Sequence, residues 1–385
     1  MTTEATVLDI LARLVAHDTT SRNPNLALMD EIAAMLATHG VRSRRVPNAD
    51  GTKASLIATI GPAEVPGIVL SGHVDTVPVD GQAWTGDPFR LRRRGERVLA
   101  RGVTDMKGYV AACLAAVPAI VAAPLARPIH LCFSYDEEVG CLATDALIAD
   151  LVAHAATPAM AFVGEPTSMG VVVGHKGKRA LDIVVEGTPG HSSLAPRHVN
   201  AVAVAARIGV AIDDLARDLA ASGARDALYD IPHSTAHIGS LHGGSALNMV
   251  PERATLACEV RVIAADDARA LLGRIETLCR DVLEPEMRRI APEAAIHVTA
   301  PIDYPPLETP EDAEIVTLAR RLAGRNAVSK VAYGTEGGRF SAAGIPTVVV
   351  GPGSIADAHQ PDESILVTEL VAAVGFLERL IADAR

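Results

Sequence analysis

Residues 129–163 read IHLCFSYDEEVGCLATDALIADLVAHAATPAMAFV. The apolar run at 129–134 predicts a buried strand, and a loop with three acidic residues at 136–138 follows it. Residues 143–154 have helical periodicity, and the apolar run at 159–163 predicts a second strand. This alternation of strand, helix and strand is typical of an α/β sheet with helices on its faces. In such sheets functional side chains gather at the carboxyl ends of the strands, where these acids stand.

The same alternation extends on both sides of this stretch. Upstream, the pattern predicts helices at 6–16, 26–39 and 108–121 and strands at 55–60 and 67–71. After the Pro305-Pro306 pair the pattern resumes, with a helix at 310–322, a strand at 347–351 and a closing helix at 362–384. We therefore expect one α/β domain with a central mixed sheet flanked by helices.

A different pattern separates the two parts of this domain. From about residue 178 the order is strand, helix, strand, strand, helix, strand, a β-α-β-β-α-β unit that is complete in itself. The simplest organisation is a catalytic domain made of residues 1–178 and 303–385. A smaller α+β domain, residues 179–302, would be inserted into it.

Composition restricts the partners and the compartment. The chain has 385 residues with 35 Lys and Arg against 46 Asp and Glu, and its net charge of -11 would repel a nucleic-acid backbone. Its five cysteines are odd in number and contain no CxxC pair, which argues against a disulfide framework and a thiolate zinc site. The N-terminal stretch MTTEATVLDILARLVAH carries acids where a secretory signal needs a basic start. We expect a cytoplasmic protein without a nucleic-acid partner.

Two further enzyme classes and a membrane span are disfavoured. The longest uncharged run lies between Lys107 and Arg127, but it is rich in alanine and contains Pro118 and Pro124. A buried core helix is the better interpretation, and no membrane partner is expected. The motifs GxSxG, GxxxxGK[ST] and GxGxxG are absent, which argues against a serine hydrolase and a nucleotide enzyme.

Possible metal ligands follow several of the predicted strands. Taken singly, each has an ordinary alternative, such as a surface ion pair, a helix cap or a solvated acidic loop. Together they form a set of carboxylates and imidazoles that suits zinc or a similar divalent ion. The set is His73, Asp105, Glu138, Glu165 and His359. Asp75, two residues from His73 on an extended chain, points to the same side and could orient its ring.

Six motifs resemble a known family. The chain is similar to the dinuclear metallopeptidase and deacylase family that includes acetylornithine deacetylase, succinyl-diaminopimelate desuccinylase, aminoacylase and glutamate carboxypeptidases. The resemblance covers nearly the whole chain, with its motifs in the family's order. The motifs are SGHVDTVPVDGQAW (71–84), RGVTDMKGYVAA (101–112), DEEVGC (136–141), GEPT (164–167), GTPGHSS (187–193) and GPGSIADAHQPDE (351–363).

The resemblance implies a site for two divalent metal ions. Zinc is the first candidate for these ions and cobalt the second. His73 and Glu165 would bind one ion, Glu138 and His359 the other, and Asp105 would bridge both. Relatives often have a cis peptide bond after the bridging aspartate, here Asp105-Met106.

The resemblance also implies three further roles. Asp75 would orient His73, and Glu137 would be the general base that takes a proton from water and passes it to the departing amine. His191, in the inserted domain, would stabilise the oxyanion, in relatives often across a dimer interface. The inserted domain would then be a lid and dimerisation domain, and the protein a homodimer.

The substrate expected from the resemblance is an N-acyl amino acid. TTSRNPNL (19–26), GTE (334–336) and AHQPDE (358–363) look most like the acetylornithine deacetylase branch, which implies hydrolysis of N-acetyl-L-ornithine in arginine biosynthesis. Glu336 could pair with the substrate's ammonium group, and Arg261 or Arg339 with its carboxylate. By resemblance Asn248 would add a hydrogen bond.

One stretch departs from that branch. Residues 337–340, GGRF, resemble the desuccinylase more closely, and an extra arginine near the pocket could favour a second substrate carboxylate. Succinyl-diaminopimelate, N-acetylcitrulline and the substrates of a general aminoacylase therefore stay open as alternatives. So does a binding protein that kept the fold and lost turnover, although the presence of Glu137 beside every expected ligand argues against it.

Overall fold

The computed structural model describes residues 2–385, which divide into two compact units with separate hydrophobic cores. Unit 1 contains the described residues up to Gly174, together with Leu307–Lys330 and Thr335–Arg385. Unit 2 contains His175–Pro306 and Val331–Gly334. The insertion expected at residues 179–302 lies within unit 2.

Unit 1 is built on a nine-stranded mixed sheet, which confirms the expected fold class. Its centre is a parallel group with the order β6, β3, β7, β18. These strands span Ile129–Ser134, Ile68–His73, Met160–Val163 and Thr347–Val349. All their residues are buried, as expected for parallel strands covered on both faces. Further strands extend the sheet on both sides. On one side β2 (Ala54–Ile60) and β1 (Ser43–Pro47) pair antiparallel, and on the other β8 (Val171–His175) pairs antiparallel with β18. The short strands β16 (Leu307–Glu308) and β17 (Val328–Val331) pair with β8.

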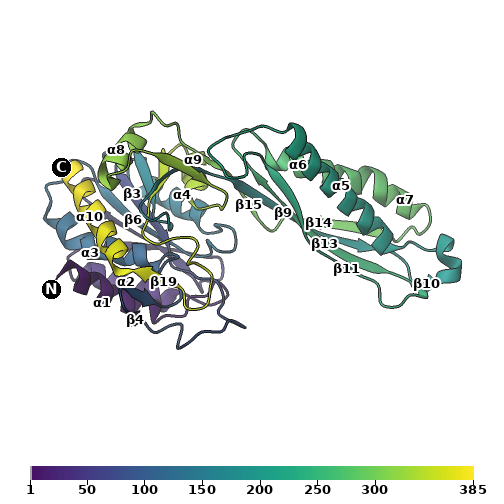
Figure 1. The fold of residues 1–385 in the computed structure, drawn as a ribbon, viewed down its shortest axis with the longest axis horizontal. Coiled ribbons are helices and arrows are strands. Elements are labelled where there is room, and N and C mark those ends of the chain that lie inside the picture. Colours follow the sequence, from purple (N-terminus) through teal and green to yellow (C-terminus); the bar gives the residue numbers. More distant parts are fainter. Residues whose placement is uncertain (1) are drawn as a thin grey trace. The chain divides into compact units, whose positions relative to one another are not determined.

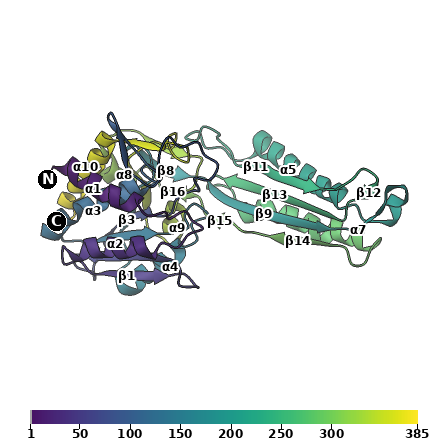
Figure 2. The same ribbon diagram turned by 90° about the horizontal axis from the view of Figure 1, so that it is seen from below.

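Helices cover both faces of this sheet (Figures 1 and 2). One face packs against α1 (Thr3–Val15), α2 (Leu26–Ala37), α3 (Lys107–Ala122), α8 (Glu314–Ala323) and α10 (Val367–Asp383), and the other against α4 (Thr144–His154) and α9 (Gly337–Ala342). Helix α3 is buried along almost its whole length, as expected for a core helix. Over residues 2–385, no helix combines the length and apolar character needed to cross a membrane.

Unit 2 has the predicted β-α-β-β-α-β order, drawn in teal and green in Figure 1. It consists of β9 (Gly177–Glu186), α5 (Ala201–Ser222), β11 (Thr235–Gly243), β13 (Arg253–Val262), α6 (Ala268–Thr277) and β14 (Ala295–Thr299). The helix after β13 continues through η2 (Leu278–Leu283) into α7 (Glu284–Arg288). The strands form an antiparallel sheet with the order β11-β13-β9-β14, to which β15 (Asp303–Tyr304) adds a short pairing with β9. Residues of β13 alternate between buried and more exposed positions, so the helices cover one face of this sheet.

Several short elements were not anticipated. In unit 1 the hairpin of β4 (Arg92–Arg94) and β5 (Arg97–Leu99) pairs with β19 (Ser364–Leu366). This pairing explains why the closing helix begins at Val367 instead of residue 362, because the preceding residues are held in an extended strand. In unit 2, β10 (Gly190–His191) pairs with β12 (Met249–Val250) and leads into the 3-10 turn η1 (Ser192–Arg197).

Candidate active site

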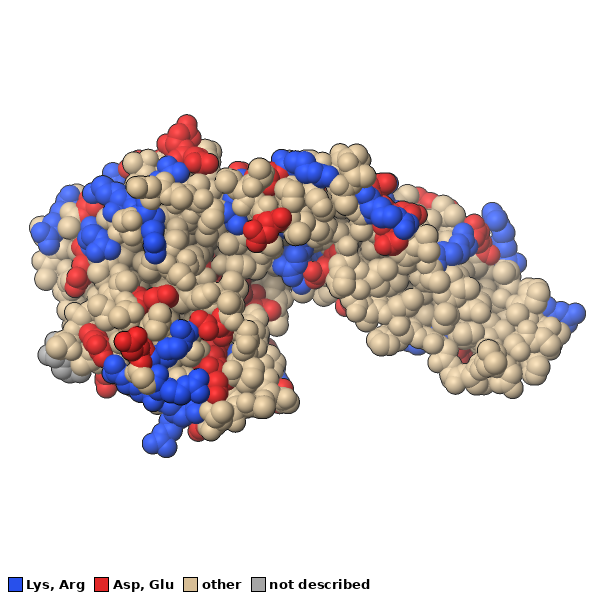
Figure 3. All heavy atoms as spheres, in the orientation of Figure 1, with Lys and Arg blue, Asp and Glu red and all other residues tan. Residues whose placement is uncertain are grey.

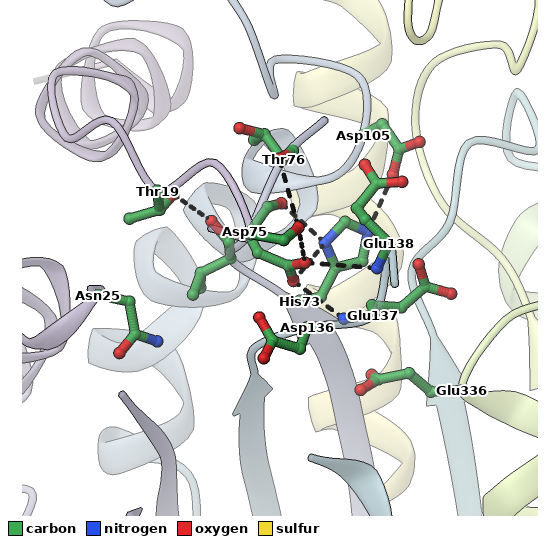
Figure 4. A network of polar contacts seen from close by, with 12 residues as sticks. Thr19, Asn25, His73, Asp75, Thr76, Asp105, Asp136, Glu137, Glu138 and Glu336 are labelled. Atoms are coloured by element: carbon green, nitrogen blue, oxygen red, sulfur yellow. Dashed lines mark hydrogen bonds and ion pairs between the residues drawn. The ribbon is translucent and has the colours of Figure 1, made fainter. Parts of the chain in front are cut away.

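The expected ligands from the central strands meet at one edge of the unit 1 sheet, where Figure 4 shows His73 together with Asp105 and Glu138. His73 is the last residue of β3, Glu138 lies in the loop after β6, and Glu165 follows β7. These strands are parallel neighbours, so their carboxyl ends lie at the same edge. Asp105 reaches this edge from the loop before α3, and its peptide bond to Met106 is cis, as the resemblance led us to expect.

Asp105 lies between the two histidines. The Nε2 atom of His73 lies 3.0 Å from one carboxylate oxygen of Asp105 and 3.6 Å from Oε1 of Glu165. The Nε2 atom of His359 lies 3.1 Å from the other Asp105 oxygen and 3.1 Å from Oε2 of Glu138. The structure thus brings all five expected ligands together, and each oxygen of Asp105 faces a different imidazole.

The chemistry of these donors fits divalent cations. The ligand atoms of His73, Asp105 and Glu138 lie within 4.8 Å of one another, and so do those of His73, Glu137 and Glu165. Four carboxylates crowd this volume, yet within residues 2–385 their ion pairs are with histidines, not with lysine or arginine. Carboxylates this close are stable only if cations or protons compensate their charge. Hard oxygen donors with imidazoles suit zinc and similar ions.

Burial and mutual repulsion raise the pKa values of the acids. Burial raises the pKa of Glu137 and of Glu165 well above the ordinary value. Burial, with the negative charge of Asp105, raises the pKa of Glu138 to about 7. Hydrogen bonds to Asp105 and Glu138 raise the pKa of His359 to about 10. Without other cations the cluster therefore retains protons, which bound metal would displace.

Asp75 anchors the acidic loop as well as His73. Its backbone oxygen lies 3.0 Å and its Oδ1 atom 3.4 Å from Nδ1 of His73. Its carboxylate accepts hydrogen bonds from the backbone N–H groups of Glu137 (3.2 Å) and Glu138 (3.3 Å). One side chain thus contacts both segments that carry ligands, a typical arrangement for a residue that orients ligands.

Two residues near the site were not singled out from the sequence. The hydroxyl of Ser21 donates to Oδ2 of Asp75 at 2.7 Å, and Nζ of Lys53 lies 2.6 Å from Oδ1 of Asp136. Ser21 lies in the stretch TTSRNPNL, which the resemblance connected only with substrate preference. The presence of a polar residue in a motif shared with relatives could have indicated a role for Ser21. Its contact with Asp75 could not be predicted, because the two residues are 54 positions apart in the sequence.

The burial of Glu336 argues against its expected role. Its carboxylate accepts hydrogen bonds from the hydroxyls of Ser71 (3.0 Å) and Thr144 (2.9 Å), and only 1% of the residue is exposed. A group this enclosed offers a substrate ammonium no contact surface, and its hydrogen bonds join β3 to the start of α4. Arg339, on α9, lies 2.6 Å from Asp145 and donates to a backbone oxygen in the loop after β6.

The other residues expected to contact substrate belong to unit 2. His191 is exposed on β10, with its Nδ1 atom 2.8 Å from the Ser193 hydroxyl. The N–H group of Ser192 donates to the backbone oxygen of Asn248 at 3.0 Å, so His191 and Asn248 are neighbours. Arg261 lies on β13, 2.9 Å from Glu259. Their roles in catalysis or binding stay predictions.

Sequence comparisons give the same family over most of the chain. The profile described as peptidase family M20/M25/M40 matches residues 69–383. The acetylornithine deacetylase of Photorhabdus laumondii is 33% identical over 354 residues, which cover 91% of this chain and 88% of that protein. The acetylornithine deacetylase of Myxococcus xanthus is 33% identical over 377 residues, 97% of this chain and 96% of that protein.

Solved structures share the fold at low sequence identity. The aminopeptidase PepT of Bacillus cereus has a TM-score of 0.76 and 19% identity, with 99% of this chain and 98% of that chain covered. YXEP of Bacillus subtilis, described as a dinuclear metal binding peptidase from the M20 family, has a TM-score of 0.68 and 14% identity, with 99% and 98% covered.

Proposed function

Because the chain belongs to peptidase family M20/M25/M40, we propose that it is a metal-dependent hydrolase that cleaves the linear amide of an N-acyl amino acid. The first candidate substrate is N-acetyl-L-ornithine, with ornithine and acetate as products. The observation that carries this proposal is the 33% identity to acetylornithine deacetylases over more than nine tenths of the chain. A cytoplasmic role in arginine biosynthesis would follow from this activity.

The arrangement of the ligands supports two divalent ions, with zinc as the first candidate and cobalt as the second. His73 and Glu165 would hold one ion, and Glu138 and His359 the other. Asp105 would contribute one oxygen to each, because its two oxygens already face different histidines. When bound, the ions would polarise the amide carbonyl and make a water molecule more acidic.

The protein's own residues would perform the proton transfers. Glu137 lies beside the ligands, and burial raises the pKa of its carboxyl group, as a proton-accepting residue near neutral pH requires. It would take a proton from the attacking water and deliver it to the departing amine. Asp75 would keep both the His73 ring and the backbone of Glu137 in place.

Residues of unit 2, and Arg339 of unit 1, would act on the substrate. We assign His191 to stabilising the negative charge on the carbonyl oxygen and its neighbour Asn248 to a hydrogen bond with the substrate. Arg261 or Arg339 would pair with the substrate's carboxylate. We further propose a homodimer that forms through unit 2, whose edge strand β11 offers backbone groups for pairing with a second copy. Sedimentation equilibrium tests this assembly.

A substrate panel tests the proposed activity. Metal-stripped protein is reloaded with zinc or cobalt and offered N-acetylornithine, N-acetylcitrulline, N-acetylmethionine and succinyl-diaminopimelate, with kcat/KM measured for each. We expect N-acetylornithine to have the highest value. A higher value for succinyl-diaminopimelate would favour the desuccinylase alternative suggested by GGRF at residues 337–340. No hydrolysis of any compound by loaded protein would favour the binding-protein alternative.

Matched variants separate the base from the ligands. Glu137→Gln should keep its metal content and lose about 10² to 10⁴ in kcat, because proton transfer is lost while the ligand set stays complete. Glu165→Gln should lose metal as well as activity. Loss of metal from Glu137→Gln would instead make Glu137 a ligand, which its closeness to His73 and Glu165 also permits.

A further inference from the structure

The loop that carries His359 is the least enclosed part of the site. It runs from the end of β18 to β19, and His359 has a φ of 60°, in the left-handed region. The His359 side chain is 48% exposed, whereas that of His73 is fully buried and that of Glu165 is 5% exposed. Packing of the ring itself therefore does little to fix His359, and contacts elsewhere in the loop must position it.

A buried ion pair provides such contacts. Arg101 and Glu363 lie 2.7 Å apart through Nη1 and Oε2, with side chains 1% and 0% exposed. The second oxygen of Glu363 accepts hydrogen bonds from the backbone N–H groups of Thr104 (2.9 Å) and Asp105 (3.1 Å). A single carboxylate at the end of the His359 loop thus holds the backbone of Asp105.

Arg101 extends the same network to His359. Its guanidinium donates to the backbone oxygen of Gln360 at 3.4 Å and to the side chain of Gln82, and it lies over the ring of Trp84 at 5.0 Å. Gln82 in turn donates to the backbone oxygen of His359 at 2.9 Å. The network therefore contacts the chain at His359 itself, one residue after it, and at Asp105.

Neighbouring arginines join the same loop to the β4–β5 hairpin. Arg92 pairs with Asp362 at 3.0 Å, and Arg97 pairs with Asp357 at 2.6 Å. The mixed cluster of basic and acidic side chains at the lower left of Figure 3 lies over the position of β4 in Figure 1. Arg93 differs from these arginines, because its partner is Glu4 near the N-terminus instead of the His359 loop.

We propose that Arg101 and Glu363 are positioning residues that hold Asp105 and His359 at a fixed separation and so set the affinity of the metal position formed by Asp105, Glu138 and His359. This inference rests on the proposed dinuclear site. The other position depends less on the pair, because His73 and Glu165 stand at the ends of the neighbouring buried strands β3 and β7. Because Asp105 also contributes to that other position, the pair should affect both positions, and the one that uses His359 more strongly.

The test measures metal binding by the full-length protein. Metal-stripped wild type and Glu363→Gln are titrated with Zn²⁺ by calorimetry and equilibrium dialysis. In Glu363→Gln an amide must present its NH₂ group either to Arg101 or to the N–H groups of Thr104 and Asp105, so one side of the network is broken. We expect the wild type to bind two ions, and the variant to bind one with an affinity lowered less than about 3-fold and the second about 10- to 100-fold more weakly.

Three further proteins assign the weakened position and exclude misfolding. His359→Ala removes a ligand of the affected position, so its remaining tight ion should match that of Glu363→Gln. Gln82→Ala removes the hydrogen bond to the backbone oxygen of His359 and should weaken the same metal position. Because Gln82 is partly exposed, this variant still tests the inference if Glu363→Gln does not fold. Arg93→Gln removes an ion pair of the same hairpin that does not involve the His359 loop, and should bind both ions as the wild type does.

The outcomes distinguish this inference from the proposed function. If the wild type binds fewer than two ions, the dinuclear site fails and the positioning role fails with it. If the wild type binds two ions and both variants of the network also bind both ions with wild-type affinity, the positioning role alone is overturned. Equal weakening of both positions in Glu363→Gln or Gln82→Ala would also overturn it, because the effect would not be selective.

Discussion

His130 is a buried titratable residue that lies outside the ligand set. It is on β6, with no exposed surface, and its Nδ1 atom lies 2.9 Å from the hydroxyl of Thr59. Burial lowers the pKa of His130 to about 4, because the charged ring would lose its hydration. The unfolded chain, with a histidine pKa of about 6.5, therefore takes up a proton at a higher pH than the folded protein does.

This difference predicts a loss of stability in acid. A histidine with a lowered folded pKa contributes its full stability above about pH 6.5, and the contribution is lost as the pH falls toward 4. We expect wild type to lose about 2 to 3 kcal/mol more than His130→Asn between pH 7 and pH 4.5. The asparagine does not titrate, and its side-chain oxygen can replace the contact to Thr59.

Urea unfolding of metal-free protein at both pH values measures the difference. Other titrating groups are common to the two proteins and cancel in the comparison. An equal loss of stability in wild type and His130→Asn would show that the ring does not resist protonation.

At the scale of residues, the sequence was sufficient to find the carboxylates and histidines that meet at the candidate site, and insufficient to find the residues that support them. His73, Glu138 and Glu165 were recognisable because each follows an apolar strand that is itself recognisable. Glu363 was not recognisable, because its partner Arg101 is 262 residues away in the sequence. Arginine and glutamate are also usually exposed, so their residue types do not predict a buried ion pair. Glu336 was assigned to a substrate because residue type predicts charge but does not reveal burial.

Among the structural elements, the turn after β7 depends on Gly164. A Cβ atom at this position would lie 2.0 Å from Cγ of Tyr109, whose ring is 1% exposed on α3. Gly164 also donates its N–H to the backbone oxygen of Ser71 at 3.1 Å, just before Glu165. The close approach of α3 to the end of β7 is therefore possible only without a side chain.

We expect Gly164→Ala to destabilise the protein by about 1 to 3 kcal/mol, because the ring cannot move out of a packed core. It should also weaken metal binding, because Glu165 would shift. Gly209→Ala is the matched control. Gly209 lies within helix α5, and a Cβ atom there would contact Ile238 of β11 at an ordinary van der Waals distance of 3.6 Å. That variant should gain about 1 kcal/mol from helix propensity. Thermal unfolding of both variants would contradict the argument if Gly164→Ala were as stable as the wild type.

Elements with a local apolar pattern were predictable from the sequence, and elements defined by a distant pairing were not. Strand β6 has the predicted bounds, residues 129–134, because an apolar run ended by polar residues defines it locally. Strands β5 and β19 have only three residues each, and their pairing joins segments more than 260 residues apart, as Leu99 with Ser364. No local pattern encodes such a pairing.

On the scale of the whole molecule, the proposed metal site belongs to one unit. All five expected ligands lie in unit 1, and each unit has its own hydrophobic core. A ligand that binds only the folded form stabilises the part that binds it, by about 3 kcal/mol at a hundredfold excess over its dissociation constant. Metal should therefore stabilise unit 1 against unfolding more than unit 2.

Differential scanning calorimetry tests this expectation. Zinc-loaded protein should show two transitions, and EDTA should lower the one that belongs to unit 1 by about 5 to 10 °C while leaving the other nearly unchanged. The transition of unit 1 is identified with Gly164→Ala, which should lower the same one. A single transition that shifts as a whole would mean that the two cores unfold together.

The order of elements in the sequence changes at about residue 178, close to the start of unit 2 at His175. The sequence did not predict that residues 331–334 belong to unit 2. These four residues come after Leu307–Lys330, which belong to unit 1, and are too few to form a recognisable pattern.

Separation of the ligands from unit 2 has an evolutionary consequence. The interruption falls between Glu165 and His359, yet unit 2 supplies none of the five donors. Recombination that exchanges residues 175–306 between relatives would therefore leave the recipient's set of five expected metal ligands unchanged. Chimeras made at these junctions would inherit the expected metal ligands and Glu137 from one parent, and His191, Asn248 and Arg261 from the other. They would test whether selectivity follows the exchanged segment.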